Sequence, residues 1–193
     1  MLAILFTAGT AQAKTVNGCV LKAKAKCSSK KLNWKLSYHG NLSGANFRKA
    51  KMRGADLSDA NLKGADLRSA DLTNANLTGA NLKNAKLNNV SAENSNFYGA
   101  SLTKAVLSNG NFSNAGFYGA DFTNANLAGS NSPPPPPPFS NETPKTTTNL
   151  INANLWGSTL SGTNLTNVNL ENANLYGSVA SPSPANFTGS LLY

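Results

Sequence analysis

The sequence has few charged residues, a single histidine, two cysteines and no long apolar run. Only 13% of its 193 residues are charged, which is roughly half the share found in an average soluble domain. One histidine and two cysteines are too few to build the usual four-ligand structural zinc site. No run approaches the roughly 20 apolar residues that a membrane-spanning helix needs. These absences disfavour a zinc-stabilised domain and predict no transmembrane segment.

Acidic residues are absent from the first part of the chain. No Asp or Glu precedes Asp56, whereas eleven of the seventeen Lys and Arg residues lie between Lys14 and Arg53. From Asp56 onward, six basic residues face eight acidic ones, so the formal charge of +9 arises in the N-terminal segment. This distribution indicates a partner-binding or envelope-facing end rather than a protein that coats nucleic acid.

Alternating lysines in that segment form a candidate basic patch. Two interpretations remain open: a site for anionic lipid, cell-wall polymer or nucleic acid, or a solvated cap that blocks end-to-end stacking of molecules. The patch consists of Lys22, Lys24, Lys26, Lys30 and Lys31.

Residues 1–13 have features of a secretory signal peptide. Leu2 to Phe6 form a short apolar core, and Ala11-Gln12-Ala13 is a small-x-small cleavage site before Lys14. The positively charged region that normally leads such a signal is missing. We expect an exported protein, whether periplasmic, lumenal or secreted.

The two cysteines lie in a basic N-terminal cap that we assign to residues 14–39. Cys19 and Cys27 have seven residues between them. A disulfide that closes the Lys-rich loop is favoured over a zinc site or a redox pair, for which Cys-x-x-Cys spacing is more typical. Later in the cap, Trp34, Leu36 and Tyr38 alternate with polar residues, which predicts a capping strand.

A five-residue repeat follows the cap. Every fifth residue from Leu42 to Leu127 is Leu, Phe or Met, except Ala92, and a small residue precedes each by two positions. This period matches neither a helix nor an open strand, so the chain must turn once per repeat. The last position of each unit is Gly or Asn in fourteen of eighteen units, and both residues tolerate the positive φ of a tight corner.

The units, such as Ala55-Asp56-Leu57-Ser58-Asp59, resemble the pentapeptide-repeat family, whose pattern is roughly Ala-(Asp/Asn)-Leu-x-x. The resemblance implies an all-β fold, a right-handed quadrilateral β-solenoid with four units per coil and about six coils. It also implies a non-enzymatic structural or interaction module.

The repeat divides the rest of the chain into four segments. The main solenoid covers residues 40–129 and continues over residues 148–178, and a C-terminal cap covers residues 179–193, where Phe187, Leu191, Leu192 and Tyr193 would shield the end. Between the two blocks, residues 130–147 contain six consecutive prolines, which predict a projecting polyproline segment. Leu127 to Leu150 spans 23 residues, one step of five plus eighteen, so looping out eighteen residues leaves the solenoid uninterrupted. The insert is either a tolerated loop or a docking peptide.

Residues twenty positions apart should lie above one another in successive coils. This predicts a buried ladder of Leu57, Leu77, Phe97 and Phe117. It also places Ala92 in a column with Met52, Leu72 and Phe112, where the bulk of Phe112 could fill the space that Ala92 leaves.

Four units carry an outward aromatic residue after the central one: Tyr98, Tyr118, Trp156 and Tyr176. Once the eighteen inserted residues are subtracted, all four share one column, which we call the aromatic strip. It offers a stacking surface for a glycan or a contact surface for a protein. Alternatively, the rings only stabilise neighbouring coils.

Catalysis, cofactors and metals find no support in the sequence. His39 has no readable Ser, Cys or carboxylate constellation, and Asp56, Asp66, Asp71 and Asp121 occupy a repeat position shared with Asn. Some members of the family that these units resemble mimic DNA and bind gyrase, but such mimics need a strongly negative surface, which this chain lacks. We therefore expect a non-enzymatic exported scaffold for a protein or glycan, without specific nucleic-acid binding; anchoring through the basic cap and DNA mimicry are the alternatives.

Overall fold

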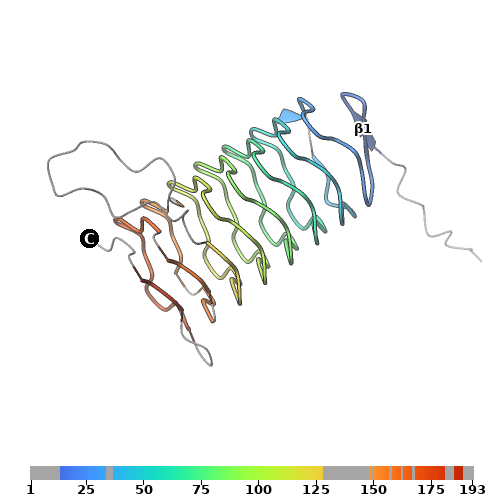
Figure 1. Cartoon of the computed structure of the whole chain (residues 1–193). Helices are drawn as coiled ribbons and strands as arrows, with labels where there is room; N and C mark the ends of the chain where they lie inside the picture. The colour runs from blue at the N-terminus through green and yellow to red at the C-terminus, as the bar shows by residue number, and fades with distance from the viewer. Residues whose placement is uncertain are drawn as a thin grey trace, which may run out of the picture.

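The computed structural model describes residues 14–33, 37–127, 148, 150–156, 158–161, 163–166, 168–180 and 185–188. Two named strands occur in these residues, β1 (Lys14–Val16) and β2 (Cys19–Leu21), which pair antiparallel as a hairpin. The other described residues wind into a rod of stacked coils with β1 at one end (Figure 1).

Single-residue parallel bridges join each coil to the next. Asn61 pairs with Asn81 and Asp66 with Lys86, a separation of twenty residues. Bridges begin at four successive positions about five residues apart, so the rod has four sides. The longest column contains eight residues, more than the six coils predicted, because pairing extends into both predicted caps. Its members are Lys26, Asn46, Asp66, Lys86, Val106, Asn126, Asn164 and Asn186.

The core consists of the central and small residues of each unit. The predicted ladder of Leu57, Leu77, Phe97 and Phe117 is fully buried, and the rings of Phe97 and Phe117 stack with centroids 4.8 Å apart. This prediction is confirmed. Since each coil of the main block buries four central and four small side chains, apolar burial and the bridges act together to hold the rod.

The corners have the backbone conformation that their residues predict. Gly64 has a φ of 66° and Asn84 a φ of 58°. Most corner amides donate to a carbonyl of the next coil, as Gly64 N does to Lys83 O at 2.9 Å, whereas Asn109 N donates to the hydroxyl of Thr148. Four corners of the main block are filled by residues less suited to positive φ: Lys49, Asp59, Ser69 and Lys104.

Ala92 is fully buried. Space for the ring of Phe112, its neighbour in the column, comes at least in part from Gly110. A Cβ on Gly110 would collide with the ring of Phe112, so Gly110 provides space for this ring. Phe112 also packs edge-on against Phe97 with centroids 6.0 Å apart. Whether Phe112 fills the space beside Ala92 stays a prediction.

Pairing continues across the insert in the predicted register. Gly116 pairs with Asn154, Asp121 with Thr159 and Asn126 with Asn164, each 38 residues apart. This separation equals one coil of twenty plus eighteen. The polyproline segment, Pro133 to Pro138, lies outside the described residues.

The N-terminal end differs from the predicted cap. The hairpin of β1 and β2 closes the rod, and pairing begins at Lys26, so the solenoid starts well inside residues 14–39. Trp34 and Leu36 of the predicted capping strand lie outside the described residues, and Tyr38 is partly buried against the core. The predicted disulfide is present between Cys19 and Cys27, whose Cα atoms lie 5.1 Å apart.

At the C-terminal end, Phe187 is partly buried against the core, while residues 191–193 lie outside the described part.

Candidate functional site

The aromatic strip exists as a column of touching rings. Bridges at the positions two residues before each ring, such as Asn154 to Asn174, set the coils in register. Ring centroids lie 5.1 Å apart for Tyr98 and Tyr118 and 5.3 Å apart for Tyr118 and Trp156. Trp156 and Tyr176 follow at 6.1 Å. The predicted alignment of these residues is therefore correct.

Ring orientation divides the aromatic strip into two parts. The rings of Tyr98 and Tyr118 are parallel within 4°, so the face that each turns toward its neighbour is covered. Trp156 lies at 84° to Tyr118 and at 68° to Tyr176. Flat stacking of a ligand ring requires an open face. Tyr176, the most exposed of the four at 76%, offers the most open surface, and Trp156 turns its plane away from the parallel tyrosine pair.

Asparagine side chains hold the backbone beneath the rings. The side-chain oxygens of Asn96, Asn154 and Asn174 accept hydrogen bonds from the backbone amides of Tyr98, Trp156 and Tyr176 at 3.0–3.1 Å. Such Asx turns compete with regular strand pairing and fix the residue two positions later. The aromatic side chains therefore project from a fixed backbone.

A ladder of corner asparagines, which the sequence reasoning overlooked, lies one unit before the aromatic strip. Asn114 donates through Nδ2 to Asn94 Oδ1 at 3.3 Å, and Asn152 donates in the same way to Asn114 at 3.2 Å. The twenty-residue spacing of Asn94 and Asn114 was a sufficient signal.

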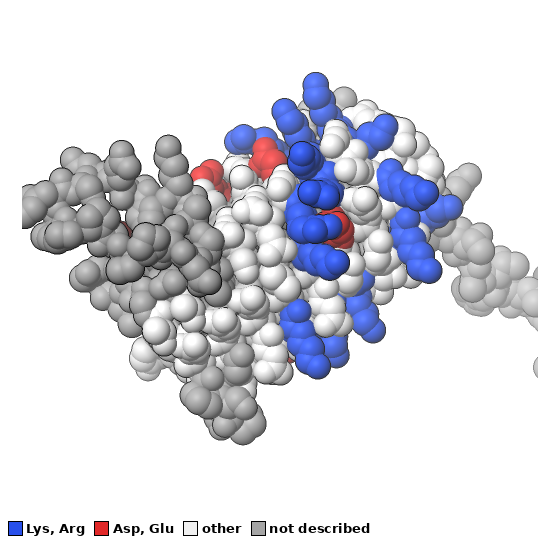
Figure 2. All heavy atoms as spheres, viewed as in Figure 1, with Lys and Arg blue, Asp and Glu red and all other residues white. Residues whose placement is uncertain are grey.

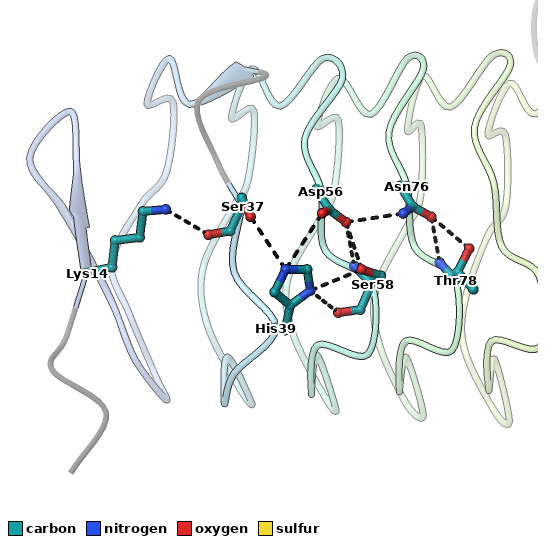
Figure 3. A network of polar contacts seen from close by, with 7 residues as sticks. All are labelled: Lys14, Ser37, His39, Asp56, Ser58, Asn76 and Thr78. Atoms are coloured by element: carbon teal, nitrogen blue, oxygen red, sulfur yellow. Dashed lines mark hydrogen bonds and ion pairs between the residues drawn. The ribbon is translucent and has the colours of Figure 1, made fainter. Parts of the chain in front are cut away.

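The same outward column continues toward the N-terminus with polar residues. His39, Ser58 and Thr78 precede Tyr98 in it, since Ser37 pairs with Asp56 and Asp56 with Asn76. Figure 3 shows this polar network. It corrects the prediction that His39 lacks a Ser or carboxylate neighbour: His39 Nδ1 lies 3.0 Å from Ser58 Oγ, and His39 Nε2 lies 3.6 Å from Asp56 Oδ2.

The network contains the three residue types of a Ser-His-Asp triad, but their hydrogen bonds differ from those of a catalytic triad. Ser58 Oγ donates to Asp56 Oδ1 at 2.8 Å. His39 Nδ1 is 2.7 Å from the backbone carbonyl of Ser58, which can only accept, so Nδ1 carries the proton. A nucleophilic serine would instead donate to an unprotonated imidazole nitrogen. The geometry therefore provides no activated Ser58.

His39 takes the place of a missing corner amide. Two residues separate the central Leu57 from the small Ala60, but only one, His39, separates Tyr38 from Gly40. Regular corners donate a backbone amide to the next coil, as Asp59 does to Thr78 O. Here the His39 side chain donates to Ser58 O. One extra residue between Lys31 and Ser37 makes Ser37 pair with Asp56 across nineteen residues, and the deleted corner returns the separation to twenty at Asn41 and Asn61.

Three aspartates that the sequence treats as repeat filler are held in the charged form. The hydroxyl of Ser58 lowers the pKa of Asp56 against a smaller effect of burial, and Arg68 lowers the pKa of Asp66 through a bond of 2.6 Å. Burial raises the pKa of Asp121, but hydrogen bonds from Thr123 and Thr103 outweigh it and the net pKa is lowered.

The predicted basic patch is divided between two places. Lys22, Lys24 and Lys26 line one groove, whereas Lys31 pairs with Lys51 in another column. Lys30 lies beside Lys31, and its carbonyl accepts from Lys51 N, but its Nζ would lie 3.6 Å from a Cβ on Gly18, a residue that lines the groove. Figure 2 shows that Lys and Arg gather over the N-terminal half of the visible face. Neighbouring cations from the next coil join them: Arg48, Lys49, Lys51 and Arg53.

The described residues hold no group of three or more His, Cys, Asp and Glu side chains arranged to bind a metal ion. In the same part of the chain, we find no helix that is both long and apolar enough to cross a bilayer.

The repeats match the profile of the family described as pentapeptide repeats, with eight copies over residues 41–79, 75–114, 95–131 and 148–179. These ranges cover more than half of the chain. The chain belongs to the pentapeptide repeat family. No curated protein matches this pentapeptide repeat protein in sequence.

Solved structures of other pentapeptide repeat proteins are similar to it. HetL, a protein involved in heterocyst differentiation regulation from the cyanobacterium Nostoc, is 26% identical, with 86% of this chain and 72% of that chain covered and a TM-score of 0.44. QnrB1, a plasmid-mediated fluoroquinolone resistance protein, is 18% identical, with coverage of 86% and 78% and a TM-score of 0.47. A protein of the Arabidopsis thaliana thylakoid lumen is 21% identical, with coverage of 83% and 74% and a TM-score of 0.17.

Proposed function

We propose that this pentapeptide repeat protein is an exported, non-enzymatic scaffold that binds a protein partner along the aromatic strip. One observation carries the proposal. Among the described residues, six large hydrophobic side chains are exposed, and four of them form this single column. Solvent-exposed aromatic residues that cluster on a rigid support are typical of protein interfaces.

The ring geometry favours a protein over a glycan as the partner. Parallel stacking covers the inner faces of Tyr98 and Tyr118, so this pair offers edges and hydroxyl groups, which suit hydrogen bonds and edge contacts. A sugar needs open ring faces in succession, and the aromatic strip supplies these mainly at Trp156 and Tyr176. A glycan therefore stands as the second candidate, favoured only at this end.

Export is supported by the disulfide between Cys19 and Cys27, because such bonds persist in oxidising compartments. Cell fractionation tests this part of the proposal directly. We expect the native protein in the envelope or lumen, with both cysteines protected from alkylation until a reductant is added. A cytosolic protein with free thiols contradicts export.

The binding role is tested by capture of partners on the immobilised mature protein. The test variant replaces Tyr98, Tyr118, Trp156 and Tyr176 by Ser, and the control replaces Lys63 and Lys83, outward residues of adjacent coils on the next side, by Ser. We expect a partner that the native protein and the control retain and the test variant loses. If the test variant keeps every partner but unfolds at lower urea, the aromatic strip is structural only.

Two smaller variants separate the candidate partners. Tyr98→Phe with Tyr118→Phe keeps the stack and removes only the hydroxyls, whereas Trp156→Ser with Tyr176→Ser removes the open faces. Loss of binding in the Phe variant supports a protein partner. Binding to a glycan array that only the Trp156 and Tyr176 variant abolishes supports the glycan.

A further inference from the structure

The lysine groove at the N-terminal end is a second surface, independent of the aromatic strip. It is a depression of about 490 Å³ lined by Gly18 and Val20 of the β1–β2 hairpin and by residues 22–26. Its three lysines, Lys22, Lys24 and Lys26, are all exposed. Three of the seven residues that line the groove are therefore lysines.

Covalent and hydrogen bonds hold the backbone of this groove in place. The disulfide between Cys19 and Cys27 closes the loop that contains all three lysines. Within the loop, Lys24 N donates to Ser43 O at 2.8 Å, and Ala25 O accepts from Asn46 N at 2.8 Å. The lysines project from a fixed loop, so binding loses less backbone entropy than it would on a free tail.

Negative charge does not neutralise this end of the rod. No acidic residue occurs before Asp56. The two ion pairs of Arg residues in the described chain join Arg53 to Asp71 at 3.7 Å and Arg68 to Asp66 at 2.6 Å, and neither involves the groove lysines. A site with unpaired cations attracts multivalent anions at long range.

The distribution of these cations favours a flexible polymer over a flat membrane. Lys26 begins one column, Lys31 pairs with Lys51 in the next, and Lys24 lies over the corner that contains Gly44. The charge thus spreads over two adjacent sides and the corner that precedes them. A bilayer can contact one side at a time, whereas a linear chain can follow the charge around the rod.

We propose that the disulfide-braced lysine groove binds the phosphate groups of a linear, base-free phosphate polymer. Ammonium groups form charge-assisted hydrogen bonds with phosphate oxygens. Proteins that bind single-stranded nucleic acids add aromatic side chains on which the bases stack. None of the groove residues is aromatic, so the site recognises phosphate and offers nothing to a base.

Titration with inorganic polyphosphate tests the proposal. The test variant carries Lys22→Gln, Lys24→Gln and Lys26→Gln, and the control carries Lys63→Gln, Lys83→Gln and Lys104→Gln, which remove the same charge from the body of the rod. We expect the test variant to bind about tenfold more weakly or worse, with a shallower salt dependence, while the control changes little. If both variants lose polyphosphate affinity equally, the groove is not the binding site, because net charge alone then explains binding.

The disulfide provides a second measurement. Replacing both Cys19 and Cys27 by Ser leaves every lysine in place, so a loss of affinity reports on the bracing of the loop. We expect this Ser variant to bind polyphosphate more weakly than the native protein does. Circular dichroism checks that its rod stays folded. Unchanged affinity in a folded Ser variant overturns the bracing role.

Alternative ligands give distinct outcomes. Stronger binding to anionic lipid vesicles than to polyphosphate at equal phosphate overturns the polymer assignment in favour of a membrane. Stronger binding to single-stranded DNA than to polyphosphate overturns the base-free assignment. No binding of polyphosphate at low salt overturns the proposal as a whole.

Discussion

The coils before and after Ser91 share the same backbone pairing between successive coils but carry different side chains. Before it, the core is mainly aliphatic and the surface carries most of the Lys and Arg residues. After it, four buried phenylalanines form a connected cluster, and the aromatic strip covers one side. The bridges are the same in both regions. The repeat thus specifies the scaffold, while the variable positions specify two separate surfaces.

The last coils differ further because hydroxyl groups replace alanine inside the rod. Ser158 and Thr163 are buried, and their hydroxyls donate to Phe117 O and Phe122 O at 2.8 Å. Alanine fills this position in most of the main block. The interior therefore accepts polar groups where a backbone carbonyl of the previous coil can satisfy them.

The largest expected effect comes from breaking the aromatic core. Phe117 contacts Phe97, Phe112 and Phe122, so Phe117→Ala should lower the free energy of unfolding by about 3–5 kcal/mol. Leu57→Ala, the same column in the aliphatic region, should cost about 2–4 kcal/mol. Urea unfolding of both variants makes the comparison, and a smaller loss at Phe117 shows that the ring cluster adds nothing to the core.

Corner substitutions test whether both regions share the same backbone requirement. Gly64 and Gly99 have φ values of 66° and 61°, with open space where a Cβ would lie. Gly64→Ala and Gly99→Ala should each cost about 1–2 kcal/mol from positive φ alone. Lys49→Gly, at a φ of 58°, should stabilise the rod. Thermal unfolding measures all three variants. Unequal costs at Gly64 and Gly99 contradict the idea that the two regions have the same backbone requirement at their corners.

The buried hydroxyls are expected to have a smaller effect. Ser158→Ala restores the residue typical of the main block and removes one hydrogen bond, so we expect a loss of about 0.5–1.5 kcal/mol. The reciprocal change Ala100→Ser inserts a hydroxyl into the main block. Chemical denaturation should show both variants less stable than the native chain; a gain from Ser158→Ala contradicts a role for the bond to Phe117.

Acid should weaken the N-terminal coils through their aspartates. The pKa values of Asp56 and Asp66 are lowered in the folded chain, so their contribution is present above about pH 4, the ordinary aspartate pKa, and is lost as the pH falls through the folded values. Asp66→Asn should flatten this dependence. Urea midpoints measured between neutral and acid pH provide the test, with Asp59→Asn as control. Identical slopes in all variants argue against the effect.

Much of the rod follows from counting in fives, because coil register converts sequence spacing into spatial columns. This is why the aromatic strip, the ladder through Phe117 and the 38-residue pairing could be predicted. The N-terminal end could not. A deleted corner moves His39 beside Ser58, but an extra residue before Ser37 offsets it, so the spacing of the central residues gives no sign of it. The lysine groove depends on the hairpin at Gly18 and Val20, which lies outside the repeat.

The 38-residue step between Asn126 and Asn164 also bears on how the rod assembles. Solenoids gain stability by adding one coil to a neighbour, and every regular coil closes a segment of twenty residues. At this step the segment is nearly twice as long, which adds roughly 0.6 kcal/mol of closure entropy. Folding that spreads from either end should therefore be slightly slower at this step. The aromatic strip spans this step, because Tyr118 on one side of it contacts Trp156 on the other with ring centroids 5.3 Å apart.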